Sequence, residues 1–463
     1  MRILLFGTGD YYRKYRDWFR REDILGLVDN DENKRGTLVD GYKVYLPQEA
    51  VQLSFDCVVI LSVHEEGMRR QLLELGVPDD TIYIFSELYK HPELIMPERA
   101  VCLWGGDRLL SGILSGGHAG AVLLMSHNLD LNGAALAMFY LARILAKNGF
   151  SVFFASWTDG ALRQYLYEEN IPVVIDPNLQ MRTQREVKWT HRFRRIICNT
   201  LNYYLFLADR SPENQTIWWL HDPVMFYRSL DQELLHRIKP ENLAVYAVSP
   251  IAEGAFKTYF PDFEVRQLVY GIPDVPLQKK IHYKMELIVI GNVQEYKGQD
   301  ILVRALEMLD DEILSRIHVK VVGFRSTAYA DGVKRSAEKL GDVISFIPPV
   351  DREGVHRLLD ESDVLICPSR VDTMSIVTNE GMQHGLPCIV SDAAGVSAYI
   401  KNGENGFIVR RGDASALAER IAWCVEHRKD LEQIGKASRM VYEQYFTMEV
   451  FEKNVLKVIR EVL

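Results

Sequence analysis

Short apolar runs alternate with longer amphipathic stretches along most of the chain, and this rhythm restricts the fold more than any other feature. Up to Tyr89 the apolar runs are Ile3–Phe6, Ile24–Val28, Cys57–Leu61 and Ile82–Phe85. Each run is long enough for one buried strand, and each stretch between them is long enough for a helix. Strands that alternate with helices indicate a parallel sheet with right-handed crossovers, so we predict an α/β protein.

The same rhythm restarts twice further along the chain. A second series begins at Ala121–Met125 and includes a helical pattern over Gly133–Lys147. A third series begins at Leu287–Ile290 and ends in a helical pattern that reaches the C-terminus. The stretch between the first two series is irregular and rich in glycine, which is typical of a connector. We therefore predict a small domain at 1–90, a linker at 91–120, an N-terminal lobe at 121–274 and a C-terminal lobe at 275–463 whose last helix returns to the N-terminal lobe.

Length, charge and cysteine usage narrow the class of protein. A chain of 463 residues exceeds what one hydrophobic core holds, which agrees with several domains. Its net charge of −9 argues against a nucleic-acid-binding protein, which usually carries a basic surplus. No apolar stretch approaches the ~18 residues of a membrane span, and the N-terminus lacks the features of a signal peptide. The six cysteines form no Cys-x-x-Cys pair, so we expect a cytoplasmic protein with reduced thiols.

One stretch of the third series carries two carboxylates beside a phosphate-binding pattern. A buried strand is followed there by a loop and by a short helix that begins near Ser375. The first backbone N–H groups of that helix, at Ser375, Ile376 and Val377, have no helical partner and can hold a phosphate. Asp372 precedes these groups, and Glu380 lies one to two turns into the helix. The two carboxylates can therefore reach opposite ends of one ligand.

This stretch, with Ala393-Ala394-Gly395 and the run Asn402–Gly406 after it, resembles the C-terminal lobe of the family-4 retaining glycosyltransferases. That family carries two acidic residues separated by seven positions, a spacing that Asp372 and Glu380 reproduce. The resemblance implies that Glu380 contacts the ribose hydroxyls of the donor and that Asp372 contacts the donor sugar. A carboxylate suits vicinal hydroxyls because it accepts two hydrogen bonds at once. Aspartate replaces the usual glutamate at the first position, which shortens its reach by one methylene.

The resemblance covers roughly Ala121 to the C-terminus and implies the GT-B architecture, in which two doubly wound Rossmann-like lobes face a cleft. It implies a nucleotide-sugar donor bound mainly by the C-terminal lobe and an acceptor bound by the N-terminal lobe. It also implies retention of anomeric configuration, with a departing phosphate oxygen taking the acceptor proton. The expected acceptor is a cell-surface polysaccharide or a lipid-linked glycan. We expect no metal and no other cofactor, because no cluster of side chains has metal-ligand spacing.

A second match to the family lies between the strand that ends at Ile290 and the helix that begins near Gln299. The loop from Gly291 to Gly298 resembles the family's phosphate-gripping loop, in which an arginine and a lysine neutralise the donor diphosphate. Lys297 falls on the lysine position, whereas Asn292 stands where arginine is usual. The alternative for Lys297 is a solvated loop lysine.

Three positions of the N-terminal lobe complete the resemblance. Gly133 corresponds to a glycine loop that approaches the donor phosphates, although a helix cap at Asn132 explains much of that pattern. His221 follows the buried run Ile217–Leu220 and, at the end of a strand, is expected to line the sugar and acceptor pocket. Ser249 is expected to cap a helix rather than to take part in chemistry.

The run from Arg182 to Arg195 is basic, although the chain as a whole is acidic. Such a run with interleaved aromatic residues can dock on the anionic inner face of a membrane or bind an anionic acceptor. A solvated basic helix explains the pattern equally well. The residues assigned to this patch are Arg185, Lys188, Trp189, Arg192 and Arg194.

The first segment has part of a dinucleotide-binding pattern. Gly7-Thr8-Gly9 follows its first apolar run, and Asp29 follows its second. An acid ~20 residues after a glycine loop is typical of Rossmann domains. Tyr12 replaces the third glycine of that pattern, which normally allows close packing of helix and strand. We predict a Rossmann-like domain here, and both nucleotide binding and a docking role stay open.

Two further functions compete with the transferase hypothesis. A catalytically weak sugar-nucleotide-binding or scaffold partner of another transferase is favoured by Asn292 and Asp372, the departures from the family pattern. An NAD(P)-dependent oxidoreductase is favoured by the first segment alone.

Overall fold

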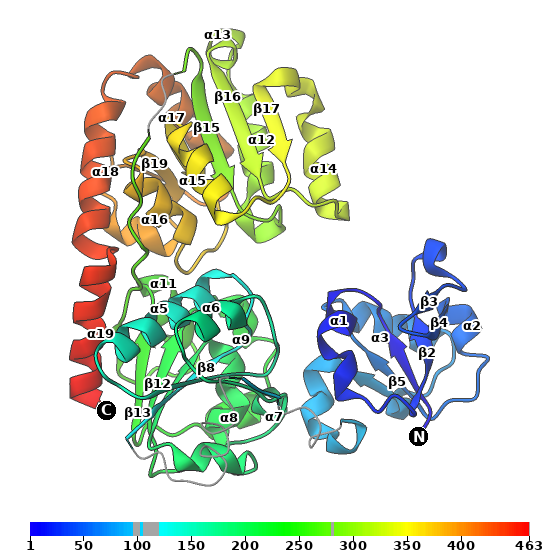
Figure 1. Cartoon of the computed structure of the whole chain (residues 1–463). Coiled ribbons are helices and arrows are strands. Elements are labelled where there is room, and N and C mark those ends of the chain that lie inside the picture. The colour runs from blue at the N-terminus through cyan, green and yellow to red at the C-terminus, as the bar shows by residue number, and fades with distance from the viewer. Residues whose placement is uncertain (96–101, 105–119, 279–281, 463) are drawn as a thin grey trace. The chain divides into compact units, whose positions relative to one another are not determined.

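The computed structural model describes residues 1–95, 102–104, 120–278 and 282–462 (Figure 1). This part of the chain is α/β throughout and contains three sheets, as the sequence predicts. It divides into two compact units, Met1–Thr216 with Asp231–Asn242, and Ile217–Leu230 with Leu243–Leu463. None of the described helices combines the length and the apolar character that a membrane span requires.

The first sheet has six strands in the order β3-β4-β2-β1-β5-β6. Its strands pair in parallel except for β3 with β4, which are antiparallel. Its core is formed by apolar side chains of the strands together with Ala50 and Leu72, which lie in two helices, and Val77. The elements are β1 (Ile3–Phe6), α1 (Asp10–Tyr15), β2 (Ile24–Val28), β3 (Leu38–Val39), β4 (Tyr42–Tyr45), α2 (Pro47–Ala50), β5 (Cys57–Ile60), α3 (Glu65–Glu74) and β6 (Ile82–Ile84).

The hairpin formed by β3 and β4 is absent from the sequence prediction. Its turn is Asp40-Gly41, and both residues have positive φ, 51° and 87°. An Asp-Gly pair with this geometry is a strong hairpin signal because its twist matches that of the flanking strands. The strands were missed because Leu38–Val39 is short and exposed, so no apolar alternation marks it.

The second sheet has eight strands in the order β14-β13-β12-β11-β8-β9-β10-β7. Strand β7 pairs antiparallel with β10 and lies within the stretch expected to be a connector. The strands are β7 (Cys102–Trp104), β8 (Val122–Ser126), β9 (Val152–Ser156), β10 (Val173–Ile175), β11 (Arg195–Asn199), β12 (Gln215–Leu220), β13 (Leu243–Ala247) and β14 (Val265–Gln267). The helices are α5 (Gly133–Lys147), α6 (Leu162–Glu168), α7 (Asn178–Met181), α8 (Tyr204–Ala208), α9 (Val224–Tyr227), α10 (Gln232–His236) and α11 (Pro250–Lys257).

The third sheet has six parallel strands in the order β17-β16-β15-β18-β19-β20. The strands are β15 (Met285–Ile290), β16 (Ile317–Val322), β17 (Ile344–Ile347), β18 (Val364–Cys367), β19 (Cys388–Ser391) and β20 (Phe407–Val409). The helices are α12 (Gln299–Glu307), α13 (Asp311–Ser315), α14 (Ala328–Ser336), α15 (Arg352–Asp360), α16 (Ile376–Gln383), α17 (Ala414–Glu426), α18 (Leu431–Tyr445) and α19 (Met448–Val462).

Helices cover both faces of this third sheet. Val364 and Ile366 of β18 belong to the same apolar cluster as residues of α12 and α17. Leu365, which lies between them and points to the other face, packs closely against Gly381 of α16. Because both of its faces are covered, β18 is a continuous apolar run, whereas β16 alternates apolar residues with His318 and Lys320.

The last helix packs by one apolar stripe. The buried residues of α19 are Phe451, Val455, Val458 and Ile459, a spacing that places them on one helical face. Phe451 stacks on the buried ring of Trp219 in β12, with ring centroids 5.8 Å apart. The N–H of Ile272 donates to the carbonyl of Phe446 at 2.9 Å, so the chain just before α19 is also held by the segment that follows β14.

Two histidines join helices α15 and α16. The Nδ1 of His384 lies 2.9 Å from Oδ1 of Asp360, and its Nε2 lies 3.0 Å from Nδ1 of His356. Burial and the neighbouring His384 lower the pKa of His356 to about 4. Burial also lowers the pKa of His384, against the influence of Asp360. The folded chain therefore favours the neutral form of both rings.

We predict that stability falls as the pH is lowered through the window set by these histidines. The unfolded chain binds more protons than the folded chain between the ordinary histidine pKa of 6.5 and about 4, so acid favours unfolding there. The loss should be on the order of 1–2 kcal/mol in urea unfolding followed by tryptophan fluorescence. His356→Gln should flatten this pH dependence, and an unchanged slope in the variant would contradict the assignment.

Candidate functional site

The third sheet has its topological switch point between β15 and β18. These two strands are neighbours, and the chain leaves β15 toward β16 on one side and β18 toward β19 on the other. In sheets of this kind a crevice forms outside the carboxyl ends of the two strands, and ligands bind there. The loops that border the crevice are residues 291–298 after β15 and residues 368–375 after β18. Both loops were singled out by the sequence analysis.

Arg370 joins the two loops by hydrogen bonds. Its guanidinium donates to both carboxylate oxygens of Asp300, at 2.7 and 2.6 Å, and to the carbonyl of Glu295 at 2.7 Å. Its backbone N–H donates to the carbonyl of Tyr296 at 2.8 Å. A bidentate arginine–carboxylate pair fixes orientation as well as distance. The first loop and the start of α12 are therefore held against the second loop.

Gly298 allows these loops to approach closely. Its φ is +74°, and a Cβ built on it would lie 2.2 Å from the carbonyl oxygen of Pro368. No other residue fits both this left-handed backbone and this contact. The position of Lys297, directly before Gly298, is fixed as a result.

Lys297 and Asp372 form an ion pair across the loops. The Nζ of Lys297 lies 2.7 Å from Oδ2 of Asp372, whose side chain is 8% exposed. Burial acts to lower the pKa of Lys297, but the Asp372 carboxylate raises it, and the net shift is upward. The lysine thus keeps its positive charge at neutral pH.

The backbone around Asp372 is fixed from two sides. On one side its N–H donates to the carbonyl of Ala393 at 3.0 Å, and its own carbonyl accepts from Gly395 at 2.8 Å. On the other side Thr373 and Met374 are held by residues from the second sheet that belong to the same compact unit. The contacts on this side are Thr373 Oγ1 to the carbonyl of His221 at 2.6 Å, Tyr270 Oη to the carbonyl of Met374 at 2.9 Å, and Ser249 Oγ to the carbonyl of Thr373.

His221 therefore lies beside the loop of residues 368–375, called the acidic loop below, and belongs to the same unit. Its ring centroid is 4.7 Å from that of Trp219 and 6.3 Å from that of Tyr270, with which it is nearly parallel. Ser249 caps α11 by accepting from the N–H of Ala252, so the prediction of a capping role is confirmed. Tyr270 and Thr373, which position the loop, were not identified from the sequence.

Helix α16 begins as predicted. Ser375 is its N-cap, and its hydroxyl accepts from the N–H of Thr378 at 3.3 Å. The N–H groups of Ile376 and Val377 lie in the first turn, where an α-helix offers no internal acceptor. They stand directly after the acidic loop and remain the candidate phosphate-binding groups.

Glu380 is almost fully buried, with 2% of the residue exposed. Its Oε1 accepts from Nη2 of Arg352 at 2.6 Å, a contact from the start of α15 that the sequence analysis missed. Burial raises the pKa of Glu380 above its ordinary value, and Arg352 opposes that shift. A buried carboxylate with one oxygen already paired can present the other to a ligand hydroxyl.

The structure thus brings five predicted residues to one region of one unit: Asp372, Lys297, Ser375, Glu380 and His221. Gly291 and Asn292 lie at the start of the same first loop. The N–H of Gly291 donates to the carbonyl of Val322 at 2.9 Å. The carbonyl of Asn292 accepts from Gln299 at 3.1 Å, and its side chain is exposed.

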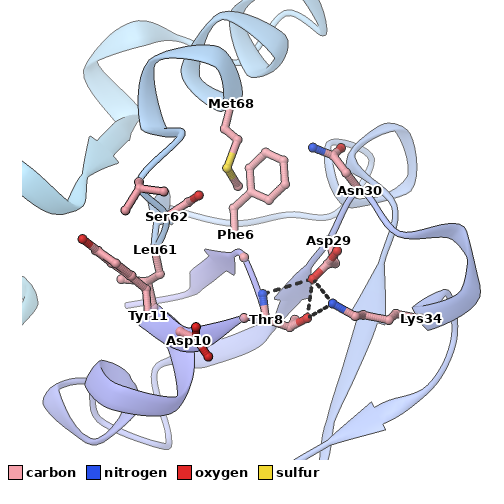
Figure 2. Close-up of a pocket in the computed structure, with 13 residues that line it drawn as sticks. Phe6, Thr8, Asp10, Tyr11, Asp29, Asn30, Lys34, Leu61, Ser62 and Met68 are labelled. Atoms are coloured by element: carbon pink, nitrogen blue, oxygen red, sulfur yellow. Dashed lines mark hydrogen bonds and ion pairs between the residues drawn. The ribbon is translucent and has the colours of Figure 1, made fainter. Parts of the chain in front are cut away.

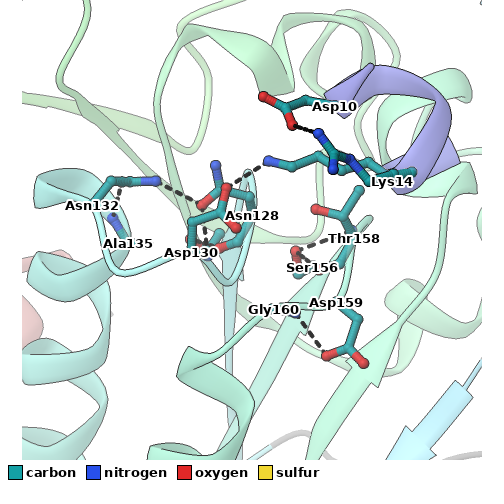
Figure 3. A network of polar contacts seen from close by, with 12 residues as sticks. Asp10, Lys14, Asn128, Asp130, Asn132, Ala135, Ser156, Thr158, Asp159 and Gly160 are labelled. Atoms are coloured by element: carbon teal, nitrogen blue, oxygen red, sulfur yellow. Dashed lines mark hydrogen bonds and ion pairs between the residues drawn. The ribbon is translucent and has the colours of Figure 1, made fainter. Parts of the chain in front are cut away.

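Gly133 belongs to the other unit, where it is the first residue of α5. Figure 3 shows the loop before this helix, with Asn128, Asp130 and Asn132. Asn132 caps this helix by accepting from the N–H of Ala135 at 3.1 Å, as predicted. Asn128 Oδ1 accepts from Asn132 and from the N–H of Asp130, at 2.8 and 3.1 Å. Lys14 forms an ion pair with Asp130 at 2.6 Å. These contacts account for the shape of the loop, and a phosphate-binding role for Gly133 stays a prediction.

Part of the basic run, Lys188–Arg192, is a 3₁₀ turn between α7 and β11, and Arg195 already begins β11. The alternative of one solvated basic helix is therefore wrong. Arg185, Lys188 and Arg194 are exposed, whereas Arg192 is partly buried. Trp189 is also partly buried, and its indole N–H donates to Asp176 at 2.8 Å. Phe193 is fully buried. The aromatic residues are engaged inside the protein, so a membrane or acceptor role for this patch, which stays a prediction, depends on its basic side chains.

Across the described ranges, no group of three or more histidine, cysteine, aspartate or glutamate side chains is arranged to hold a metal ion.

Comparison with known proteins places both loops in one family. Residues 278–441 match the family of glycosyl transferases group 1, and residues 118–245 match glycosyl-transferase family 4. The chain is similar to the crystal structure of HepE from Anabaena in complex with UDP-glucose, with a TM-score of 0.62 and 19% identity over 74% of this chain and 99% of HepE. The chain belongs to the family-4 glycosyltransferases of the GT-B fold. The resemblance drawn from the sequence is confirmed.

Curated relatives of this GT-B chain match it over shorter stretches. The D-inositol 3-phosphate glycosyltransferase of Streptomyces griseus is 30% identical over 156 residues, which are 32% of this chain and 33% of the relative. The D-rhamnosyltransferase WbpZ of Pseudomonas aeruginosa is 26% identical over 245 residues, 48% of this chain and 59% of WbpZ. The chain thus spans about a third of the length of the first of these relatives. Residues 1–83 match a separate family described as C2185-like, N-terminal.

We predict that Gly298→Ala destabilises the unit that contains the third sheet by about 2–4 kcal/mol, because it adds a left-handed alanine and a clash with the Pro368 carbonyl. Thermal unfolding measures the loss. Gly332→Ala is the matched control, since Gly332 lies in α14 with open space around it. The control should be neutral or slightly stabilising. Equal melting temperatures for the two variants would contradict the assigned role of Gly298.

Proposed function

We propose that the protein transfers a sugar from a nucleotide-sugar donor to an acceptor hydroxyl, with retention of configuration and without a metal ion. The observation that carries the proposal is the Lys297–Asp372 pair at the switch point of the third sheet, directly before the first turn of α16. A cation, a carboxylate and open backbone N–H groups stand together there. This is the set of groups that a sugar diphosphate requires.

The donor diphosphate binds Lys297 and the N–H groups of Ile376 and Val377. Negative charge grows on the diphosphate as the bond to the sugar breaks, and fixed positive groups stabilise that charge. Lys297 suits this task because Asp372 keeps it protonated and in place before the donor arrives. In the complex, Asp372 also accepts hydrogen bonds from hydroxyls of the donor sugar.

The nucleoside end of the donor binds at Glu380. Arg352 occupies Oε1 and fixes the carboxylate in one orientation, so Oε2 can accept from the ribose hydroxyls. Because Glu380 lies inside α16 and is buried, it cannot swing away to solvent. Arg352 is thus a positioning residue for the carboxylate.

The departing phosphate oxygen takes the proton of the acceptor hydroxyl as the acceptor attacks from the same face. No separate strong base is then needed. In agreement with this, the partner of the Asp372 carboxylate is the protonated Lys297, which cannot act as a base. His221, next to the acidic loop, lines the sugar side of the site.

The acceptor is a cell-surface polysaccharide or a lipid-linked glycan, bound by the second segment of the chain. The similarity to WbpZ, a D-rhamnosyltransferase, supports the transfer of a sugar. The exposed Arg185, Lys188 and Arg194 suit an acceptor that carries phosphate or lies at an anionic membrane surface. UDP is the first donor nucleotide to test, because the similar HepE structure contains UDP-glucose.

Calorimetry with UDP and GDP tests the donor site. Lys297→Ala and Glu380→Ala should each weaken binding of the accepted nucleotide by about 1–3 kcal/mol, which is ~5- to 150-fold in Kd. Lys436→Ala and Glu432→Ala are matched controls, because both side chains lie in α18 and are more than two-thirds exposed. Binding that is unchanged in both site variants would refute the donor site.

Asp372→Asn separates catalysis from binding. The variant should retain nucleotide binding within about ten-fold but lose sugar transfer by roughly 100-fold or more, since the carboxylate contacts the sugar and holds Lys297. Product formation from UDP-sugars and GDP-sugars is measured by mass spectrometry, and the anomeric configuration by NMR. A wild-type chain that binds a nucleotide and turns over no donor would favour the sugar-nucleotide-binding partner that Asn292 and Asp372 also suggest.

A further inference from the structure

A pocket of about 360 Å³ lies in the first domain, at the carboxyl ends of β1, β2 and β5 (Figure 2). It is bordered by the loop Gly7–Gly9 after β1, by Asp29 and Asn30 after β2, and by the residues Leu61–Val63 after β5. Strand β1 lies between β2 and β5, so this is the switch point of the first sheet, where ligands bind in α/β folds. Its size lies at the lower end of the range for small-molecule sites.

The fold requires glycine at one of the two glycine positions of this loop, Gly7, and leaves room for a side chain at the other, Gly9. Gly7 has φ +111°, and a Cβ there would lie 2.6 Å from the carbonyl oxygen of Leu61, so the fold itself requires it. Gly9 has φ −84°, and a Cβ there would meet nothing within 4 Å. Packing therefore does not explain Gly9, whose ψ of −148° lies outside the usual β and αR ranges. The missing side chain leaves the peptide groups of the loop open toward the pocket.

The pocket is lined by one positively charged side chain, Lys34, whose ammonium group is fixed by hydrogen bonds. Asp29 Oδ2 accepts from the N–H of Thr8 at 3.1 Å and from Nζ of Lys34 at 3.0 Å, and it also accepts from the Thr8 hydroxyl. Nζ of Lys34 is also 3.0 Å from Oγ1 of Thr8. Figure 2 shows these contacts as one network at the glycine loop. The carboxylate is used within the protein, and the third proton of the Lys34 ammonium can bind an anion at the loop.

The opposite wall of the pocket is apolar with one amide. Leu61, Val63 and Met68 line it, and Val63 is 67% exposed, which is unusual for valine. Oδ1 of Asn30 accepts from Gln71 at 2.9 Å, so the amide is fixed with its Nδ2 left to donate to a ligand. An apolar wall, an amide donor and a held cation match a heterocyclic base at one end of a ligand and a phosphate at the other.

A whole dinucleotide fits this pocket poorly. Tyr12, at the third glycine position, is buried and fills the place where a helix would approach the strand. Helix α1 has only six residues and begins with Asp10, so its dipole is short for holding a pyrophosphate. Asp10 is paired with Arg13 at 2.8 Å on the surface, so Lys34 is left as the cationic partner at the loop.

We propose that the first domain binds a mononucleotide in this pocket, separately from the donor site. The base packs against Leu61, Val63 and Met68, and the phosphate binds Lys34 and the open backbone at Gly9. This site is independent of the transferase chemistry proposed for the third sheet.

Equilibrium dialysis of the full chain with AMP and with UMP tests the proposal. One equivalent should bind to a Lys297→Ala/Glu380→Ala chain, in which the donor site is disabled. Adding Gly9→Val or Lys34→Ala should weaken that binding about ten-fold or more, by blocking the loop or removing the cation. Gly67→Val is the matched control, because Gly67 lies in α3 with open surroundings and does not line the pocket. An unchanged melting temperature of Gly9→Val shows that the domain still folds.

Three results would overturn the proposal. The first is no binding of AMP or UMP to the donor-site variant at millimolar concentration. The second is binding that Gly9→Val and Lys34→Ala leave intact, which places the nucleotide elsewhere. The third is binding of ribose 5-phosphate as tight as that of AMP and UMP, because the apolar wall would then recognise no base. Each result is distinguishable from failure of the proposed function, which UDP titration of the Gly9→Val chain reports separately.

Discussion

The backbone of Gly298 lies against the carbonyl of Pro368, and the rest of the candidate site depends on this close approach. It lets the loop after β15 and the loop after β18 meet at the switch point, where Arg370 then binds both. Lys297 directly precedes Gly298, and Asp372 lies two residues after Arg370, so their ion pair follows from the backbone arrangement. The two oppositely charged side chains are held 2.7 Å apart by a geometry that other parts of the loops enforce.

The charges of the site are arranged in two pairs, each fixed before a ligand binds. Lys297 is paired with Asp372, which lies just before α16. Glu380 lies inside α16 and is paired with Arg352. A ligand with a diphosphate in its middle and hydroxyls on both sides can replace solvent around both pairs without moving them far. Groups that are preorganised in this way stabilise a transition state without having to move when the reaction occurs. The acidic loop also makes hydrogen bonds with residues that follow β12, β13 and β14 in the same unit, so His221 is held at a fixed place beside it.

Local patterns were readable in the sequence, and distant pairings were not. The apolar runs gave the strands, and the caps Asn132, Ser249 and Ser375 gave three helix starts, because both signals depend on neighbouring residues alone. The carboxylates and Lys297 were found through their spacing. Arg352 and Arg370 were missed because their partners are 28 and 70 residues away, and nothing in the local sequence distinguishes them from solvated arginines. Trp189 was expected on a surface for the same reason, since Asp176 binds it from a different element.

A crystal structure of the full chain with bound UDP tests the central claim most directly. The account predicts the diphosphate at the carboxyl ends of β15 and β18, with an oxygen within ~3 Å of Lys297 Nζ or of the N–H of Ile376, and the ribose hydroxyls on Glu380. Density for UDP at another place, with the Lys297–Asp372 pair untouched, would contradict it.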